Sequence, residues 1–587
     1  MIGLFAVTSA GRTAASHLAG LLGREAMVVD GPLRPALHRL WPRLDAAVFF
    51  LATGATVRLI APLLRDKHTD PGVVCVDEAR RFAVALAGGH AGGANALATR
   101  VADALGCTPV ITTASDSVGV TPLDELAELL DATVDGDLAA CGVALLDGAP
   151  IKLVNPLGFP LPALPDNVTE HEHDAEWTVL IDDRVPEEDL ARNTIRMVPR
   201  TLVVGVGSAR GVTAGTVAAT IARLESEHGL DPRAVAAFAS IDLKADEQGI
   251  LDAVADWNFW HGDWHDSVGD EPPVMLTYPA EVLSTVEVPN PSEVVRKEVG
   301  TPSVAEAAAL HAAGLLAHGG RVELAAEKFT GDNVTVAAAR IRPRGRLAVV
   351  GLGPGAEDLR APRAEAELRR ASTVVGLDQY VDQIRHLIRP GTEVHASGLG
   401  DEQARADESV RLAASGKAVA LIGSGDAGIY AMASPALDSA GADIEVVGVP
   451  GVTAALAAAS LLGAPLGHDH ALISLSDLHT PWGVILRRIT AAASGDFVVC
   501  FYNPRSRQRD WQLGAALDVL RQHRPPGTPV GAVRNASRAG ERVWCAPLSE
   551  FDTSDVDMMT TVVVGSTSTR MAGGRMVTPR GYRWTNS

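Results

Sequence analysis

The stretch 347–355, LAVVGLGPG, constrains the fold more than any other part of the sequence. Four apolar residues lead into a glycine-rich turn, and residues 362–370 have the composition of a helix with proline in its first turn. The order strand, glycine turn, helix gathers main-chain amides that can hold a small polar ligand. Two other interpretations fit the spacing: an ordinary tight turn, or a dinucleotide-binding turn in which Asp378 would bind the ribose.

Apolar runs alternate with helix-like segments along the chain, which predicts an α/β fold built from several α/β units. The 587 residues leave room for three or four domains. We expect α/β domains at 1–131 and 200–340, separated by a less regular intervening module at 132–199 that is rich in Pro, Asp and Glu. A further domain is expected at 346–587, with two α/β lobes at about 346–460 and 461–587. Its strands are predicted at 347–350, 373–376, 418–422, 444–449, 471–475, 497–502, 529–533 and 561–565.

Composition and charge exclude several classes of protein. The formal net charge of −20 argues against general binding to nucleic acid or anionic membranes, and an acidic substrate would need a local basic patch. The five cysteines form no CxxC pair, so no metal site is predicted, and buried free thiols are expected. No apolar run reaches the roughly 18 residues of a membrane span, and we expect a cytoplasmic protein.

The first part of the chain carries its own candidate groups. His90 lies between two glycine pairs in GGHAGG, where a substrate could reach the imidazole and use it as a base. Arg58, near Arg65 and Lys67, could neutralise a carboxylated ligand, although a solvated basic face fits equally well. Ser303 and Glu306 match a capping box, which gives Glu306 a structural task.

Residues 1 to about 338 resemble the hydrolase that opens the ring-A lactone of cobalt-precorrin-5A in cobalamin biosynthesis. The resemblance is carried by ATGATVRLIAPLLRDKHTDP, LAGGHAGGANALATRVADALGCTPVITTASD, SIDLKADEQG and VGTPSVAEAAAL. It implies addition of water to the lactone and release of acetaldehyde. His90 is then the candidate base, Lys244 or Arg58 the candidate charge stabiliser, and Glu306 a rival base.

Residues 346 to about 582 resemble the precorrin-3B C(17)-methyltransferases, within the tetrapyrrole class of S-adenosylmethionine methyltransferases. The resemblance is carried by VVGLGPG, GSGDAGIYAMA, VPGVTAALAAASLLGAPLGHDHALISLSDLHTPW, GDFVVCFYNPRSRQR and MVTPRGY. It implies two α/β lobes with S-adenosylmethionine in the cleft between them, and favours a cofactor loop over a dinucleotide fingerprint at 351–355. It also implies methylation at C-17 coupled to ring contraction and lactone formation.

The resemblance carries over to particular positions of this chain. The implied cofactor-binding residues are Gly351, Gly353, Pro354, Gly355, Ser424, Gly425, Asp426, Ile429, Thr453, Ala454, Asn503 and Asn535. Ring contraction needs proton transfers, for which GHDHALISLSDLHTPW offers Asp469, His470 and Asp477. Arg505, Arg507 and Arg509 in NPRSRQR could clamp a polycarboxylate tetrapyrrole, or could be a solvated helix start.

Several alternatives remain open from the sequence. The substrate could be precorrin-3B or cobalt-factor III, the second of which contains cobalt and suits a chain that also carries the hydrolase. The N-terminal half could be a non-catalytic scaffold, or the whole chain a carrier of corrinoid intermediates. The resemblance also suggests a homodimer through residues 346–587.

Overall fold

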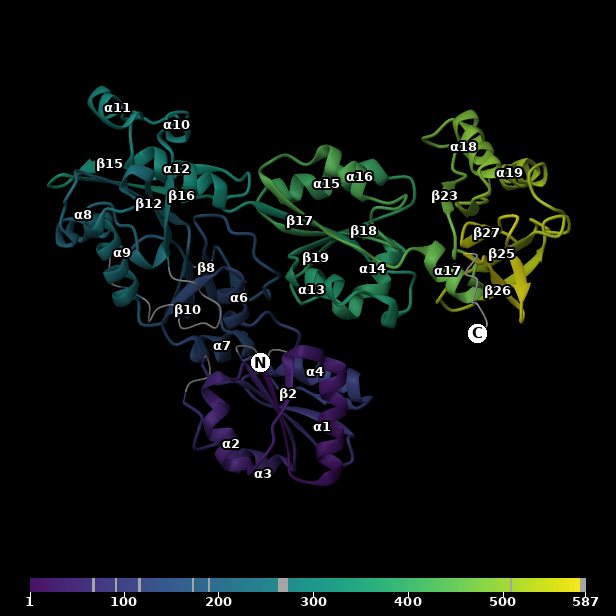
Figure 1. Cartoon of the computed structure of the whole chain (residues 1–587), viewed down its shortest axis with the longest axis horizontal. Helices are drawn as coiled ribbons and strands as arrows, with labels where there is room; N and C mark the ends of the chain where they lie inside the picture. Colours follow the sequence, from purple (N-terminus) through teal and green to yellow (C-terminus); the bar gives the residue numbers. More distant parts are fainter. Residues whose placement is uncertain are drawn as a thin grey trace, which may run out of the picture. The chain divides into compact units, whose positions relative to one another are not determined.

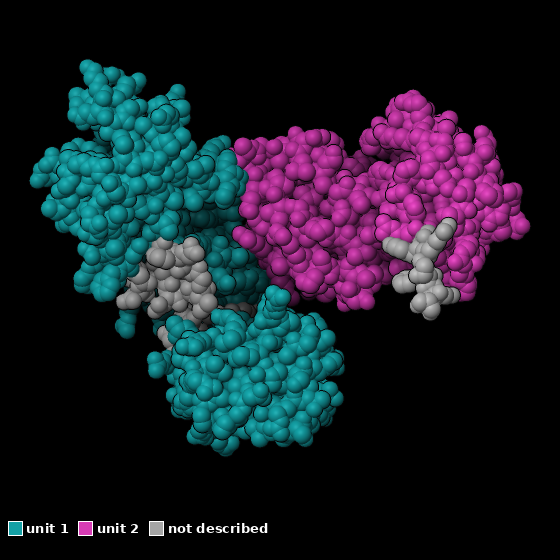
Figure 2. Space-filling view, viewed as in Figure 1, with its two compact units in different colours: residues 1–344, 389–391 teal, residues 345–388, 392–587 magenta. Residues whose placement is uncertain are grey.

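The computed structural model of the chain describes residues 1–65, 69–89, 92–113, 118–171, 174–187, 190–261, 273–506 and 509–580. The chain divides into two compact units (Figure 2): unit 1 comprises residues 1–344 and 389–391, and unit 2 comprises residues 345–388 and 392–587. Both units are built from β-sheets with helices packed against them (Figure 1), which confirms the predicted α/β fold class.

The first sheet of unit 1 has six strands in the order β2-β1-β3-β4-β5-β6. The first helix begins at Ser9 because the hydroxyl of Thr8 accepts a hydrogen bond from the amide of Gly11 at 2.9 Å. The strands are β1 (Ile2–Ala6), β2 (Ala26–Val28), β3 (Ala46–Phe50), β4 (Gly72–Val76), β5 (Phe82–Ala87) and β6 (Thr108–Val110). The helices are α1 (Ser9–Leu22), α2 (Leu33–Leu40), α3 (Thr53–Ile60) and α4 (Ala94–Leu105).

The segment 132–199 is more regular than its composition predicts. It forms a five-stranded sheet in the order β7-β11-β10-β8-β9. Short apolar runs, not long ones, make its core, and Ile151, Ile181 and Ile195 are fully buried there. Helix α6 (Leu123–Leu129) precedes this segment and packs on its core. The elements of the segment are β7 (Ala132–Asp135), α7 (Leu138–Leu146), β8 (Ile151–Val154), β9 (Val168–Thr169), β10 (Trp177–Ile181) and β11 (Thr194–Pro199).

A third sheet of unit 1 has the order β14-β13-β12-β16-β15. The alanine-rich helix α12 lies against it so closely that a Cβ at Gly205 would be 1.9 Å from the carbonyl oxygen of Ala305. The strands are β12 (Leu202–Ser208), β13 (Val235–Ile241), β14 (Val274–Tyr278), β15 (Val322–Thr330) and β16 (Val334–Ile341). The helices are α8 (Ala214–Ser226), α9 (Gln248–His261), α10 (Ala280–Leu283), α11 (Glu293–Val299) and α12 (Ala305–Leu316).

The first lobe of unit 2 contains a parallel sheet in the order β19-β18-β20-β17-β21. The strands are β17 (Gly345–Gly351), β18 (Thr373–Leu377), β19 (Glu393–Ser397), β20 (Ala418–Gly423) and β21 (Ile444–Val449). The helices are α13 (Pro362–Arg370), α14 (Asp378–Ile384), α15 (Glu402–Ala414), α16 (Ala433–Ser439) and α17 (Ala454–Leu462). In a dinucleotide-binding fold the second strand lies beside the first. Here β20 separates β18 from β17, so the dinucleotide alternative with Asp378 was wrong.

The second lobe contains a five-stranded sheet in the order β23-β24-β27-β25-β26 and a small sheet in the order β22-β29-β28. Its elements are β22 (Gly463–Ala464), β23 (His470–Ser474), α18 (Trp482–Ser494), β24 (Val498–Tyr502), α19 (Gln512–Arg521), β25 (Pro529–Arg534), β26 (Arg542–Pro547), β27 (Thr560–Val564), β28 (Arg570–Ala572) and β29 (Arg575–Val577). All eight strands predicted for unit 2 are present. The sequence missed β19 and β26, which are half-exposed edge strands, and the short strands β22, β28 and β29 of the small sheet.

Among the helices of the described residues, none is long and apolar enough to span a membrane. Cys75, Cys141 and Cys500 are buried free thiols as expected, and burial raises the pKa of Cys500 to about 12. Cys545 is exposed, so the expectation of buried thiols was wrong for that residue.

Candidate functional site

Three loops meet at the carboxyl edge of the parallel sheet in unit 2. We name them loop A (351–355, after β17), loop B (423–428, after β20) and loop C (450–453, after β21). Loops A and B are hydrogen-bonded to each other, because Gly353 donates to the carbonyl of Gly425 at 3.1 Å and Gly425 donates back at 2.7 Å. The carboxyl edge of a parallel sheet is where α/β proteins bind ligands.

Glycine is required in these loops because their backbones almost touch. A Cβ at Gly351 would lie 2.7 Å from the carbonyl oxygen of Gly425 and 2.8 Å from the amide nitrogen of Gly451. A Cβ at Gly451 would lie 2.1 Å from the same Gly425 oxygen. The glycines therefore allow three backbones to form one surface, on which main-chain groups are accessible to a ligand.

Asp426 joins two of the loops. Its Oδ1 accepts the amide of Gly428 at 2.8 Å and its Oδ2 accepts the amide of Gly451 at 3.1 Å. The sequence assigned Asp426 to the cofactor, whereas these two contacts give it a role in shaping loops B and C. Pro354, Ser424, Ile429, Thr453 and Ala454 lie in or beside the same loops, so the structure brings the predicted cofactor residues of the first lobe together.

Two tyrosines lie beside loops B and C. The Tyr502 hydroxyl, at the end of β24, accepts the amide of Ala455 at 3.0 Å and is hydrogen-bonded to the hydroxyl of Thr453. Tyr430 lies against Tyr502 with 5.3 Å between ring centroids, and its hydroxyl donates to the carbonyl of Leu472 at 2.7 Å. Burial raises the pKa of Tyr502, so its phenol remains protonated at neutral pH. The sequence analysis did not identify either tyrosine.

Asn503 and Asn535 occupy equivalent places in the second lobe. Each follows a strand, β24 or β25, and each has a left-handed backbone, with φ of 50° and 51°. Asparagine tolerates this conformation better than most residues. The Asn503 amide donates to the Ser474 hydroxyl at 3.1 Å, and the Asn535 amide donates to the Ala539 carbonyl at 3.3 Å. Both side chains thus have local partners.

The proton-transfer candidates are not gathered at one point. The side chain of Asp469 is 75% exposed, and His470 beside it is also exposed at the start of β23. Asp477 is less exposed; it accepts a hydrogen bond from Gln512 at 3.2 Å and lies 3.9 Å from Nε of Arg509. Asp477 therefore has a permanently charged arginine beside it, whereas the described ion pair of Asp469 is with the imidazole of His468, 3.0 Å away.

The arginines of NPRSRQR already have protein partners. Arg505 donates to the carbonyls of Thr553 and Ser554 at 2.9 and 3.2 Å. Arg509 donates to the carbonyls of Leu475 and Asn503 at 3.2 and 3.1 Å. Arg507 lies outside the described residues. The two described guanidiniums hold loops of the second lobe, and neither is a freely solvated cation.

The described hydrolase candidates Arg58 and Lys244 lie beside different sheets of unit 1. His90 lies outside the described residues. Arg58 is exposed on α3 and donates to the carbonyl of Gly54 at 3.1 Å. Lys244 is buried after β13, where its ammonium lies 3.3 Å from Glu247, whose other oxygen accepts the amide of Gly211 at 2.8 Å. Lys244 thus neutralises a buried carboxylate next to the glycine turn that follows β12.

The glycines flanking His90 have a packing role. A Cβ at Gly72 would lie 2.0 Å from the carbonyl oxygen of Gly92, and a Cβ at Gly88 would lie 3.1 Å from the Cα of Gly72. The amide of Asn95 donates to the carbonyl of Gly89 at 3.0 Å, which closes the loop onto the start of α4. Close backbone packing alone therefore explains glycine at positions 88 and 92.

The capping box predicted at Ser303 and Glu306 does not form. Helix α12 has Val304 at its N-cap with no side-chain cap, and Glu306 is fully buried in the first turn. Its Oε1 accepts from Asn290 at 2.8 Å and from the amide of Lys328 at 3.1 Å. Its Oε2 has no hydrogen-bond partner among the described residues. Glu306 reaches β15 instead of its own helix start, so the capping explanation was wrong.

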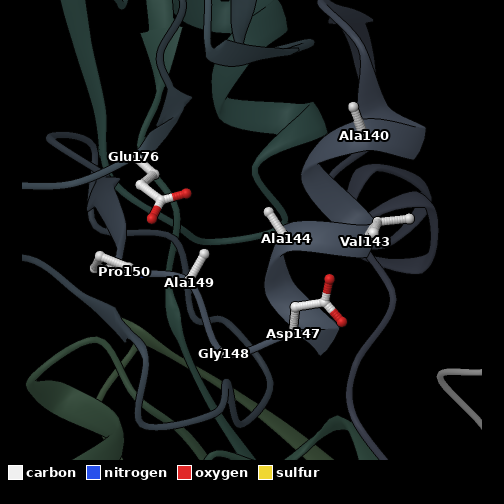
Figure 3. A pocket seen from close by; sticks show the side chains of 8 residues that line it. All are labelled: Ala140, Val143, Ala144, Asp147, Gly148, Ala149, Pro150 and Glu176. Atoms are coloured by element: carbon white, nitrogen blue, oxygen red, sulfur yellow. The ribbon is translucent and has the colours of Figure 1, made fainter.

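A pocket of about 540 Å³ in unit 1 is lined by α7, by the loop 147–150 that follows it and by Glu176, which precedes β10 (Figure 3). Small apolar residues line most of it. Among its described lining residues, the charged ones are Asp147 and Glu176, both acidic. This lining would repel a polycarboxylate, and none of the predicted site residues belongs to it.

Unit 2 thus has a two-lobed α/β fold in which three glycine loops pack together at the carboxyl edge of a parallel sheet. Residues 346–552 match the family Tetrapyrrole (Corrin/Porphyrin) Methylases. Residues 35–116 match Cobalamin synthesis G N-terminal, and residues 202–339 match Cobalamin synthesis G C-terminus. The three matches follow the order expected for a fusion of the two kinds of enzyme.

Curated relatives match the methylase part. The chain is 46% identical over 242 residues to the probable cobalt-factor III C(17)-methyltransferase of Salmonella typhimurium, which covers 40% of this chain and 99% of that protein. It is 42% identical to the precorrin-3B C(17)-methyltransferase of a Sinorhizobium species, over 39% of this chain and 91% of that protein. The chain matches 46% of the length of the longer cobalt-factor III methyltransferase of Priestia megaterium.

A solved structure, described as the methyltransferase CobJ, is 38% identical, with a TM-score of 0.39, and covers 40% of this chain and 100% of that one. The chain belongs to the tetrapyrrole methylase family. It is an enzyme of cobalamin biosynthesis, with a methyltransferase in its C-terminal part and the two cobalamin synthesis G segments before it.

Proposed function

We propose that unit 2 transfers the methyl group of S-adenosylmethionine to C-17 of a tetrapyrrole, precorrin-3B or cobalt-factor III, with contraction of the ring. The observation that supports this most is the convergence of loops A, B and C, where three glycine backbones pack without room for a Cβ. S-adenosylmethionine supplies an electrophilic methyl group when bound.

The residues of the cleft fit such a cofactor. Loops A and B offer main-chain groups and the Ser424 hydroxyl, and Thr453 and Ala454 begin helix α17 beside them. Asn503 and Asn535 are proposed to contact the adenosine from the second lobe. The task of these residues is to hold the reacting groups in line, because much of the rate of such a transfer comes from positioning.

The second lobe is proposed to handle the substrate. Asp477, beside Arg509, is our candidate for proton transfer during ring contraction, with Asp469 and His470 as exposed alternatives. Arg505, Arg507 and Arg509 are proposed to attract the substrate carboxylates, which an acidic chain would otherwise repel.

We further propose that unit 1 opens the ring-A lactone of cobalt-precorrin-5A and releases acetaldehyde. Opening a lactone requires an activated water and a stabilised oxyanion. His90 remains the proposed base and Arg58 or Lys244 the proposed cation. Glu306 is the rival base, because one oxygen of its buried carboxylate has no hydrogen-bond partner among the described residues and the carboxylate does not cap its helix.

One experiment tests both proposals. The purified chain is incubated with S-adenosylmethionine and either cobalt-factor III or precorrin-3B, and separately with cobalt-precorrin-5A, and the products are identified by mass spectrometry. We expect one added methyl group with one of the first two substrates, and acetaldehyde from the third. Absence of a methylated product from folded protein would refute the methyltransferase proposal.

A variant separates the two activities. Gly425→Val places a branched side chain in loop B at a φ of +68° and 3.5 Å from Thr453. We expect methylation to be lost and acetaldehyde release to be kept, because loop B belongs to unit 2 and the hydrolase segments to unit 1. Loss of both activities in a folded variant would contradict independent sites.

A further inference from the structure

One arginine of the second lobe reaches loops A and B of the first. The connection between β25 and β26, residues 535–541, places Arg538 so that its Nε donates to the carbonyl of Pro354 at 2.5 Å. Its terminal NH₂ group donates to the hydroxyl of Ser424 at 2.6 Å. Arg538 thus touches two loops that we propose hold the cofactor, although it is far from both in sequence.

The connection is built to hold this side chain in place. Asn535 and Ser537 both have left-handed backbones, with φ of 51° and 59°. The strained turn is fixed by Glu541, which accepts the amide of Ser537 at 2.6 Å, and by Ser537, which accepts the amide of Ala356 at 3.3 Å. Left-handed non-glycine residues cost free energy and persist where surrounding contacts enforce them.

Loop A is shaped to receive the arginine. Gly355 has a φ of +142°, and a Cβ there would lie 2.5 Å from Cγ and 2.7 Å from Nε of Arg538. The last glycine of the GPG turn is therefore needed because the stem of Arg538 fills the space beside it. This packing fixes the guanidinium at the edge of the glycine surface.

The charge of Arg538 has no carboxylate partner among the ion pairs of the described residues. The two other arginines of the same hairpin do have one: Arg534 pairs with Asp557 at 2.7 Å, and Arg542 pairs with Asp555 at 2.8 Å. A guanidinium carries five N–H donors in a planar fork. Two of them serve Pro354 and Ser424, which leaves others for an anion.

We propose that Arg538 is a carboxylate-binding residue of the methyltransferase cleft. The proposal rests on the proposed function of unit 2. A carboxylate there could belong to the amino-acid part of the cofactor or to an acidic side chain of the tetrapyrrole. Both have the planar, singly charged oxygen pair that an arginine fork binds.

The test measures binding, not turnover. Isothermal titration calorimetry is run with S-adenosylhomocysteine and with decarboxylated S-adenosylmethionine, and absorbance titration with the tetrapyrrole. The variants are Arg538→Gln, which keeps an amide donor without the charge, Arg538→Lys, which keeps the charge without the fork, and the control Arg542→Gln, which removes a paired surface arginine of the same hairpin.

If the cofactor is the source, Arg538→Gln weakens S-adenosylhomocysteine about 10- to 100-fold and leaves the decarboxylated compound unchanged, as expected for loss of hydrogen bonds to a charged group. If the tetrapyrrole is the source, the same loss appears in the tetrapyrrole titration alone. Arg538→Lys should recover part of either loss, and Arg542→Gln should bind as wild type.

Unchanged affinities for all three ligands in folded Arg538→Gln would overturn the proposal. If Arg538→Gln fails to fold, Arg538→Lys decides: full wild-type affinity for all three ligands would again overturn it. A wild-type chain that binds none of the ligands would instead refute the proposed function itself, and the assignment of Arg538 with it.

Discussion

Replacing Gly451 by alanine should separate the loops that form the proposed cofactor surface. The new Cβ would lie 2.1 Å from the carbonyl oxygen of Gly425 and 2.8 Å from that of Gly351. Carbon and oxygen need about 3.2 Å when they are not bonded, so loops B and C must move apart by about 1 Å. Both neighbours are backbone atoms, and a rotamer change cannot relieve the overlap.

The magnitude follows from the hydrogen bonds that such a movement breaks. The Asp426–Gly451 bond, at 3.1 Å, joins loops B and C, and a movement of loop B away from Gly451 also disrupts the Gly353–Gly425 pair, at 3.1 and 2.7 Å, that joins loop B to loop A. Each neutral bond contributes about 1 kcal/mol, and the bond to the carboxylate contributes about 1.5–3 kcal/mol. The correct loop geometry is therefore destabilised by about 3–5 kcal/mol. Affinity for S-adenosylhomocysteine should then fall at least about 100-fold.

Gly448→Ala is the matched control. Gly448 lies three residues earlier, on β21, and a Cβ there would meet no atom within 4 Å. We expect the control to bind S-adenosylhomocysteine as wild type does in calorimetry, and to keep the wild-type melting temperature. If Gly451→Ala bound as tightly as Gly448→Ala, the close packing of loops A, B and C would not be what forms the binding surface.

Three further outcomes are expected. Tyr502→Phe leaves the buried amide of Ala455 without its acceptor, and should lower the free energy of unfolding in urea by about 1–2 kcal/mol; an unchanged midpoint would contradict this contact. Glu306→Gln keeps an acceptor for Asn290 and Lys328 and should melt as wild type, whereas Glu306→Ala should cost about 2–4 kcal/mol; equal melting temperatures of the two variants would refute the assignment. Burial by itself raises the pKa of Asp231, but hydrogen bonds and charge from Arg233, with charge from Arg196, hold that pKa below its ordinary value. Its contribution to stability is present above the unfolded pKa of about 3.9 and is lost as the pH falls through the lower folded pKa, so urea midpoints should fall less between pH 5 and pH 3 in Asp231→Asn than in wild type; parallel curves would argue against it.

Local sequence patterns were sufficient to predict regular elements of unit 2. Helix α13 begins at Pro362 and ends at Arg370 as predicted, because proline favours the first turn and the arginines favour the last. The central strands were found from apolar runs that are buried on both faces, as β17 and β20 are. Strand β19 escaped because this exposed edge strand has no apolar run, whereas β26 contains a run at 543–546 that the sequence analysis overlooked.

Signals that depend on tertiary contacts were less reliable. The spacing of Ser303 and Glu306 fits a capping box, but the carboxylate accepts hydrogen bonds from Asn290 and from the amide of Lys328 in β15 instead of capping its own helix. At the proposed cofactor site, the glycine loops were predicted because each is a local motif. Tyr502 and Arg538 were not predicted, because both lie far from the loops in sequence. Tyr502 contacts them from the end of β24, and Arg538 from the connection that follows β25.

The seating of Arg538 on Gly355 has a consequence for exchanging parts between related methyltransferases. A chimera that joins the first lobe of this chain to a foreign second lobe would set loop A against whatever residue stands at position 538. A shorter side chain would leave the space beside Gly355 empty, and a foreign first lobe with a larger residue at position 355 would expel the arginine. The two lobes are therefore not independent modules, and functional hybrids should carry positions 355 and 538 from the same parent.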